Sequence, residues 1–361
     1  MTQLSIQAGP TAFQHIKDNG LSPLDVSAIF GASGAAKWLA IYGLDKAIFS
    51  QWFAGLHQQI DHKIDVFGTS VGAFKLAAAT QSDPSTALSS LADAYINQHY
   101  EGKVSAEQIS VETKKILNAF LSDNAINEIL NNDHFNFHCA SVLCSGWIGN
   151  TNTLLQSMSM VKAFGLSLLG RRFHKNMFER VIFHNSQSER NFKGLDQFRT
   201  HQVSLTEKNF IKAILSSGSI PVVMPGVTDI PDAPIGTFRD GGILDYHPLP
   251  TNLVNISKGL VLYPHFYTHL KEGWFDKFTP WRRANAEQLD RVVLISPSDE
   301  FIRSLPGGTI PDRKDFYEFK GNDEERVRRW TLVKQKSEIL GQEFIEKTNS
   351  GEIASIVKLI Q

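Results

Sequence analysis

The sequence predicts a layered α/β fold, on three observations. Short apolar runs that end in Gly, Ser, Asn or Pro alternate with longer segments of helical periodicity, which is typical of a sheet covered by helices. One of these runs leads directly into a G-x-S-x-G motif and an Ala-rich helix. No repeat, low-complexity segment or Pro/Gly/Ser linker divides the chain. We therefore expect a single domain over residues 1–361, with a C-terminal helical extension over about 320–361.

Six strands are expected from runs of apolar residues bounded by turn residues. In chain order they are Val26–Phe30, Ile64–Phe67, Phe135–Leu143, Val181–His184, Leu260–Tyr263 and Val292–Ile295.

Helices are expected between the strands, where their starts can be recognised. Asp83 followed by Pro84 can cap and open one helix. Ser105 and Gln108 have the spacing of a capping box ahead of a second helix. The segment from Asp323 onward carries a helical apolar stripe, which predicts a third.

Composition allows a large core and excludes several classes of protein. Hydrophobic residues make up 42% of the chain and there are 24 Phe, which excludes intrinsic disorder. The 36 basic and 37 acidic residues leave a net charge of -1, so no global field draws the protein to phosphate backbones. We therefore expect no nucleic-acid partner.

Cysteine usage and the lack of long apolar segments favour a soluble, cytoplasmic protein. Cys139 and Cys144 alone make no disulfide framework, so we expect reduced thiols in the core. The N-terminal residues show no secretory signal. The longest apolar stretch, Met158–Leu169, is broken by Lys162 and is too short to span a bilayer.

The G-x-S-x-G motif of Gly68, Ser70 and Gly72 follows the predicted strand Ile64–Phe67. A sharp turn from strand to helix strains the central residue and presents its hydroxyl, while the flanking glycines let neighbouring chain pass. The helix that follows points amide N–H groups at any negative charge formed there. A simple turn is the alternative, but the strand before and the helix after favour Ser70 as a nucleophile.

A loop of small residues, Gly31–Ala36, follows the strand Val26–Phe30 and precedes a helix. Such a loop leaves backbone N–H groups unblocked, as an oxyanion hole requires. Lys37 can brace the loop or neutralise an anionic head group. A nucleotide-binding loop is the alternative, but neither G-x-G-x-x-G nor G-x-x-x-x-G-K-[ST] spacing is present.

Two downstream stretches complete a family pattern. The first is Ser216–Pro221, and the second is a D-G-G triplet, Asp240 with Gly241 and Gly242, whose glycines form a tight turn around the carboxylate. The order of small-residue loop, G-x-S-x-G elbow, small-Ser-x-x-I-P stretch and D-G-G resembles the patatin-like phospholipases and acyl hydrolases, over about residues 8–250. The opening Gly9–Leu21 is similar to a bacterial branch of that family.

The resemblance implies a three-layer α/β/α fold with a central, mostly parallel sheet and a nucleophile elbow. It also implies catalysis by a Ser-Asp dyad without histidine. Ser70 would be the nucleophile, Asp240 the base and later the acid, and the amides of Gly34 and Ala35 the oxyanion donors. Lys37, Gly68, Gly72 and Gly241 would support the site.

The chain departs from the family pattern at two points. The usual three glycines of the first loop are Ser33-Gly34-Ala35 here, and the common Asn pair after D-G-G is Asp245-Tyr246. Alanine allows a narrower range of backbone angles than glycine at the donor position.

Asp240 must act as a stronger base than an ordinary carboxylate. Burial would raise its pKa, and a short hydrogen bond to Ser70 would let it accept the proton. A turn-capping role is the alternative for Asp240. A Ser-His-Asp triad of the α/β-hydrolase type is also open, with His247, His265 or His269 as its histidine.

Two segments mix apolar and basic residues as lipid-contacting segments do: Met158–Arg180 and Trp274–Arg283. A core helix with a solvated basic end explains either segment equally well, and we favour that interpretation. His134 and His138 fall in a predicted strand, where this spacing keeps them apart, so we expect no metal site.

The sequence thus predicts a serine hydrolase of lipid carboxylic esters, of phospholipase A, lysophospholipase or lipase type. The alternatives are a Ser-His-Asp esterase and a non-catalytic acyl-lipid binding protein. We expect no cofactor, a lipid or fatty-acyl ester as substrate, and peripheral membrane contact at most. The sequence says nothing of oligomeric state.

Overall fold

The computed structural model describes residues 2–54, 59, 62–100, 102, 104–150, 152–279 and 281–360. Within them, ten strands form one sheet in the order β10-β1-β9-β8-β2-β3-β4-β5-β6, with β7 paired to β4. The strands are β1 Leu4–Ala8, β2 Val26–Gly31, β3 Ile64–Gly68, β4 Phe135–Cys144, β5 Phe178–His184, β6 Thr200–Ser204, β7 Thr237–Asp240, β8 Leu260–Pro264, β9 Val292–Pro297 and β10 Lys358–Leu359.

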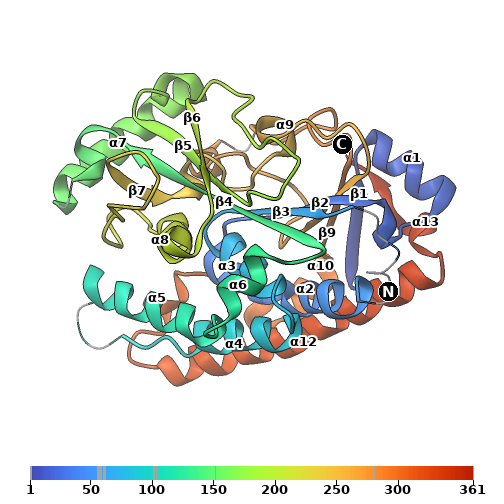
Figure 1. The fold of residues 1–361 in the computed structure, drawn as a ribbon. Coiled ribbons are helices and arrows are strands. Elements are labelled where there is room, and N and C mark those ends of the chain that lie inside the picture. The colour runs from blue at the N-terminus through green and yellow to red at the C-terminus, as the bar shows by residue number, and fades with distance from the viewer. Residues whose placement is uncertain are drawn as a thin grey trace.

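Helices cover both faces of the sheet, which makes a three-layer α/β/α fold. Figure 1 shows α3, α4, α5 and α12 on one face, and α1 and α9 on the other. The α-helices are α1 Pro10–Asn19, α2 Tyr42–Ala47, α3 Val71–Ala79, α4 Pro84–Ile96, α5 Ala106–Phe120, α6 Ala125–Leu130, α7 Thr153–Leu169, α8 Glu207–Ser217, α9 Pro250–Leu253, α10 Asp299–Ser304, α11 Asp315–Glu318, α12 Asp323–Asn349 and α13 Ile353–Ile356.

The predicted elements are present with small changes of boundary. All six predicted strands are confirmed, and the structure adds the short strands β1, β6, β7 and β10. The Asp83 side chain caps α4 by accepting the Thr86 N–H at 3.0 Å. Ser105 and Gln108 form the predicted capping box at the start of α5. The helical tail is α12, which packs against α2 and α4.

Sheet register brings the ends of three strands to one place. β2, β3 and β4 are parallel, with Gly31 opposite Gly68 and Gly68 opposite Cys139. The loop after β2 and the turn after β3 therefore leave the sheet side by side. β7 runs antiparallel to β4 with Asp240 opposite Ser141, two residues beyond Cys139. Ser70 likewise lies two residues beyond Gly68, the residue opposite Cys139. The strand pairing therefore places Asp240 and Ser70 at the same level along β4.

Helix α7 differs from the favoured prediction of a core helix with a solvated basic end. Its buried residues are Gln156, Ser159, Ala163 and Ser167, which are small or polar, whereas several of its large apolar side chains are exposed. That prediction was wrong for α7. Within the described residues, no helix combines the length and hydropathy needed to cross a bilayer.

Candidate active site

Ser70 occupies the sharp turn between β3 and α3. Its φ of 53° and ψ of -130° lie in a region that non-glycine residues rarely adopt, as the strained geometry of a nucleophile elbow requires. A Cβ on Gly72 would lie 2.2 Å from the Gly31 carbonyl oxygen, and one on Gly68 would strike the Gly72 backbone. Only glycines therefore let α3 start so close to β2 and β3.

Backbone contacts fix the elbow. The Ser70 N–H donates to Ser217 Oγ at 3.0 Å, and the Ser217 hydroxyl donates to the Ala140 carbonyl at 2.7 Å. Ser217 thus holds the elbow to β4. Ser217 lies in the small-Ser-x-x-I-P stretch, where no sequence pattern distinguishes its role from that of Ser216 or Ser219.

The structure brings Ser70 and Asp240 together. The Ser70 hydroxyl donates to Asp240 Oδ2 at 2.8 Å, across 170 positions of sequence. The Gly242 N–H donates to the other carboxylate oxygen at 2.7 Å, and the Asp240 N–H donates to the Ser219 carbonyl at 2.9 Å. Gly241 begins the turn that aims the carboxylate. Both side chains reach solvent only slightly, since Ser70 is 8% and Asp240 is 7% exposed.

Burial changes the chemistry of this carboxyl group. Burial raises the pKa of Asp240 to about 6, while the hydrogen bonds from Ser70 and Gly242 oppose the rise. Near neutral pH the group is therefore a carboxylate whose basicity exceeds that of a solvated aspartate. This property suits a general base that receives the proton of a serine hydroxyl.

The small-residue loop lies beside Ser70. Gly34 and Ala35 line the same cavity as Ser70, and within the described residues neither of their amide N–H groups donates to an acceptor. Ala35 has a φ of 50°, the left-handed conformation that glycine adopts without cost. The Ser33 hydroxyl is hydrogen-bonded to that of Thr69 at 3.0 Å, which ties the loop to the elbow.

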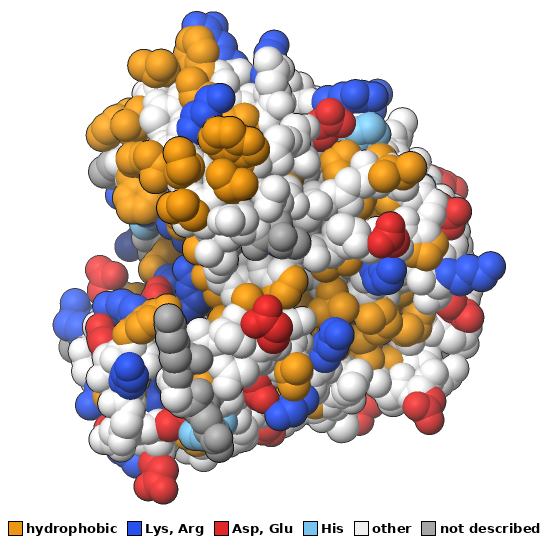
Figure 2. Space-filling view, turned by 90° about the vertical axis from the view of Figure 1, so that its left-hand side faces the viewer, with side chains coloured by type: hydrophobic (Ala, Val, Ile, Leu, Met, Phe, Trp, Pro, Cys, Tyr) orange, Lys and Arg blue, Asp and Glu red, His pale blue; other side chains and the backbone are white. Residues whose placement is uncertain are grey.

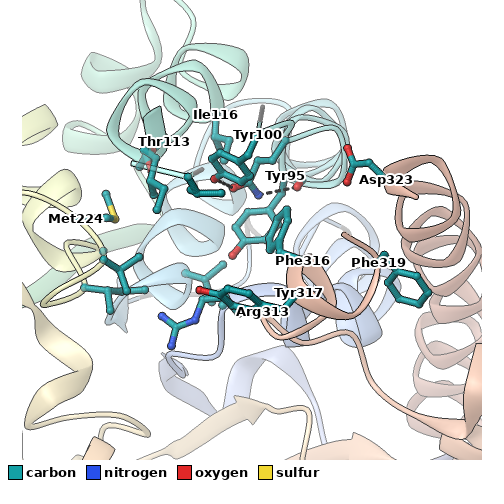
Figure 3. Close-up of a pocket in the computed structure, with 18 of the residues that line it drawn as sticks. Tyr95, Tyr100, Thr113, Ile116, Met224, Arg313, Phe316, Tyr317, Phe319 and Asp323 are labelled. Atoms are coloured by element: carbon teal, nitrogen blue, oxygen red, sulfur yellow. Dashed lines mark hydrogen bonds between the residues drawn. The ribbon is translucent and has the colours of Figure 1, made fainter. Parts of the chain in front are cut away.

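Two cavities of about 390 Å³ each meet at Ser70. The first is lined mostly by aromatic and aliphatic side chains. Figure 3 shows Tyr95, Tyr100 and Phe316 on one side of it and Met224 on the opposite side. Its mouth also holds Arg313, which lines both cavities.

The second cavity contains positively charged groups. Lys37, Lys277 and Arg313 line it together with Asp240 and the Ser33–Ala35 loop. Lys37 forms an ion pair with Asp312. The pKa of Lys277 is lowered to about 7, mainly by burial and further by the positive charges of Lys37 and Arg313. Lys277 lies on the short helix Trp274–Phe278 and Arg313 on a loop. Neither belongs to a motif, so no sequence pattern indicated this cluster.

A buried ion-pair network supports the D-G-G turn from behind. Arg180 donates to both carboxylate oxygens of Asp245 at 2.7 and 2.9 Å and to those of Asp196 at 2.9 and 2.8 Å. The Asp245 carbonyl accepts the Thr69 hydroxyl at 2.7 Å. Asp245, which departs from the family pattern, therefore anchors the turn to β5.

The three candidate histidines form no hydrogen bond with Ser70 or Asp240 among the described residues. His247 Nδ1 accepts the Lys271 N–H at 2.9 Å, and His265 Nδ1 accepts the Tyr267 N–H at 2.9 Å. Burial lowers the pKa of His265 to about 3 and that of His269 to about 4. In the described part of the chain, no histidine is hydrogen-bonded to Ser70 or Asp240 or lines either cavity. The geometry therefore gives no support to the Ser-His-Asp alternative.

Comparison with known proteins finds distant structural neighbours among solved structures. No family model matches the sequence, and no curated protein matches it. A crystal structure of VipD from Legionella pneumophila matches with a TM-score of 0.31 and 13% identity. The match covers 77% of this chain and 56% of the VipD chain, so this chain spans little more than half of that protein.

Proposed function

We propose that this protein is a serine hydrolase of lipid carboxylic esters that works through Ser70 and Asp240. The single observation that carries the proposal is the 2.8 Å hydrogen bond between the strained Ser70 and a buried carboxylate with a raised pKa. Strain, burial and a high carboxylate pKa each cost stability, and a structural turn needs none of them.

The chemistry follows from the contacts. Ser70 Oγ attacks the ester carbonyl carbon while its proton passes to Asp240, and the Gly34 and Ala35 amides stabilise the oxyanion. Asp240 then returns the proton to the departing alkoxide, which leaves as an alcohol, while the acyl group stays bound to Ser70 Oγ. Water attacks the acyl carbonyl carbon as Asp240 takes its proton. When the bond to Ser70 Oγ breaks, Asp240 returns this proton to Oγ, so the carboxylic acid leaves and the serine hydroxyl is restored.

The two cavities suggest how a lipid ester would be oriented. An acyl chain fits the apolar cavity beyond Phe74 and Ile116, because such a chain needs apolar walls and no hydrogen-bond partners. An anionic head group fits the other cavity beside Lys277 and Arg313. The third cation there, Lys37, is paired with Asp312. Replacing Ile116 by Trp should shorten the acyl chain that is cleaved best, in a panel of p-nitrophenyl esters from butyrate to palmitate.

A matched set of variants tests the dyad. Ser70→Ala and Asp240→Asn should each reduce hydrolysis of p-nitrophenyl butyrate at least about a thousandfold, as loss of a nucleophile or its base does. Ser90→Ala and Asp123→Asn, which change residues outside both cavities, should keep wild-type rates. Normal turnover by either dyad variant, with folding shown by circular dichroism, would refute the assignment.

A non-catalytic acyl-lipid binder is the alternative that the Ala35 backbone favours, since its left-handed conformation is costly for alanine. A fluorophosphonate probe separates the two. Covalent labelling of wild type but not of Ser70→Ala supports the enzyme. A resistant Ser70 in a protein that still binds fatty acid supports the binder.

A further inference from the structure

Helix α7 exposes the side chains that a helix of a globular protein normally buries. Leu154, Val161 and Leu169 are 67, 71 and 72% exposed, and Met158 and Leu168 are about half exposed. They recur at helical spacing along one side of the helix, opposite the buried stripe of small and polar residues. A face this apolar on a soluble surface marks a contact with another apolar phase.

Neighbouring segments extend the same apolar surface. The short helices Gly146–Gly149, Arg171–His174 and Trp274–Phe278 all pack against α7. They contribute Trp147, Phe173 and Phe278, which are each about half exposed. Phe278 also contacts Phe164 of α7, at 5.2 Å between ring centroids. The next segment adds Trp281 at 75% exposure, and Arg282 ties it to the carbonyls of Ser167 and Leu168.

The charges of this surface are positive. The chain has no Asp or Glu between Asp133 and Glu179. The exposed side chains Lys162, Arg172 and Lys175 all come from that stretch, and Arg283 adds a fourth cation beside Trp281. Figure 2, which faces the side of the molecule where α7 lies, shows hydrophobic side chains gathered on the upper lobe with Lys and Arg among them.

The surface is continuous with the mouth of the candidate active site. Ser157 and Met160, on another side of α7, line the second cavity, which we call the cationic cavity and which Ser70 and Asp240 also line. Trp274 and Lys277 line the same cavity from the short helix whose end carries the exposed Phe278. A single layer of secondary structure therefore separates the exposed apolar side chains from the cavity.

We infer that the α7 surface, defined by Leu154, Met158, Val161, Leu168 and Leu169 with the flanking aromatic side chains, docks on anionic phospholipid bilayers. Leu and aromatic side chains enter the boundary between head groups and acyl chains, and the surrounding Lys and Arg side chains bind the anionic head groups. A second copy of this chain would cover the apolar side chains equally well, but it would bring the same cations face to face. Charge complementarity therefore selects the anionic bilayer.

Vesicle cosedimentation of the full chain tests this surface. We would use Ser70→Ala protein, so that lipid is not hydrolysed, with vesicles of equimolar phosphatidylcholine and phosphatidylglycerol. Protein should pellet with these vesicles, bind much less to phosphatidylcholine alone, and be partly released by salt. Replacing Leu154, Val161 and Leu169 together by Gln should lower the partition coefficient at least about tenfold, since each buried Leu or Val is worth roughly that factor.

The matched control replaces three half-exposed apolar residues far from α7, namely Leu24, Ile339 and Leu359, also by Gln. It should bind like the parent protein. Equal binding by the two triple variants, or no binding by the parent, overturns the inference. Self-association is the competing outcome. It would hold, and the inference would be overturned, if the parent protein bound no vesicles and was a dimer by light scattering while the α7 variant was a monomer. Binding is measured with the Ser70→Ala protein, which lacks the nucleophile. A failure to bind vesicles would therefore count against the docking surface and not against the proposed hydrolysis.

Discussion

The buried carboxyl group of Asp240 lowers the stability of the folded protein at neutral pH, and this cost can be measured. Its pKa rises from 3.8 to about 6 on folding. The folded state therefore holds the proton more tightly, so the stability from this group is full below pH 4 and is lost as pH rises through 6. The full loss amounts to about 3 kcal/mol at pH 8.

Asp240→Asn removes this titration and nearly preserves shape. The Asn carbonyl oxygen can still accept the Gly242 N–H, and its amide can donate to Ser70 Oγ. Because about 1 kcal/mol of the loss has already occurred at pH 4.5, stability of the variant relative to wild type should rise by about 2 kcal/mol between pH 4.5 and pH 8. Guanidinium unfolding followed by tryptophan fluorescence at both pH values gives this difference.

Comparing the two proteins at each pH cancels the titration of all other groups that they share. Asp123→Asn, at an exposed site, serves as the control and should show a difference that changes little with pH. If the difference for Asp240→Asn is also independent of pH, the carboxyl group has an ordinary pKa in the fold, and the argument that burial strengthens it as a base fails.

Three further outcomes follow from the site. For p-nitrophenyl butyrate, kcat/KM should rise with pH through a midpoint of about 6, as the Asp240 carboxylate forms. Lys277→Gln should raise KM roughly fivefold for an anionic phospholipid at pH 6, a change of about 1 kcal/mol, but not for the neutral ester. This effect should shrink above pH 7, where wild type loses the Lys277 charge. Arg180→Leu leaves Asp196 and Asp245 buried without their cation, so unfolding free energy should fall by about 3–5 kcal/mol in guanidinium titrations.

The elbow could be predicted from the sequence because local patterns encode it, whereas the pairing of Ser70 with Asp240 was implied by the family resemblance. A strand, a G-x-S-x-G turn and a helix start are contiguous, and parallel pairing of β2 with β3 makes their carboxyl ends neighbours. The D-G-G triplet marked Asp240, but its position beside Ser70 depends on the short strand β7, which the sequence reading missed. Only four residues long, that strand gives too little alternation to be recognised.

The cationic cavity was inaccessible for a different reason. Lys37, Lys277 and Arg313 lie on three segments that are more than 30 positions apart in sequence. The sequence around a single Lys or Arg does not distinguish it from an ordinary solvated charge. Their common position depends on how the segments after β2, β8 and β9 fold over the same edge of the sheet. No periodicity records such packing, so only coordinates reveal that Lys277 and Asp240 share a cavity.

The apolar pattern of α7 is compatible with two arrangements, a helix whose apolar side faces the core and one whose apolar side faces outward. The spacing of Leu154, Met158 and Val161 fits a core-facing stripe as well as an outward one, because periodicity fixes which residues share a side but not what that side meets. The opposite side held the deciding signal. Gln156, Ser159, Ala163 and Ser167, which are small or polar, are the buried residues of α7, and they form the stripe that packs against the protein. Because these residues face the protein while Leu154, Leu168 and Leu169 face outward, we propose an apolar partner outside the fold for this helix.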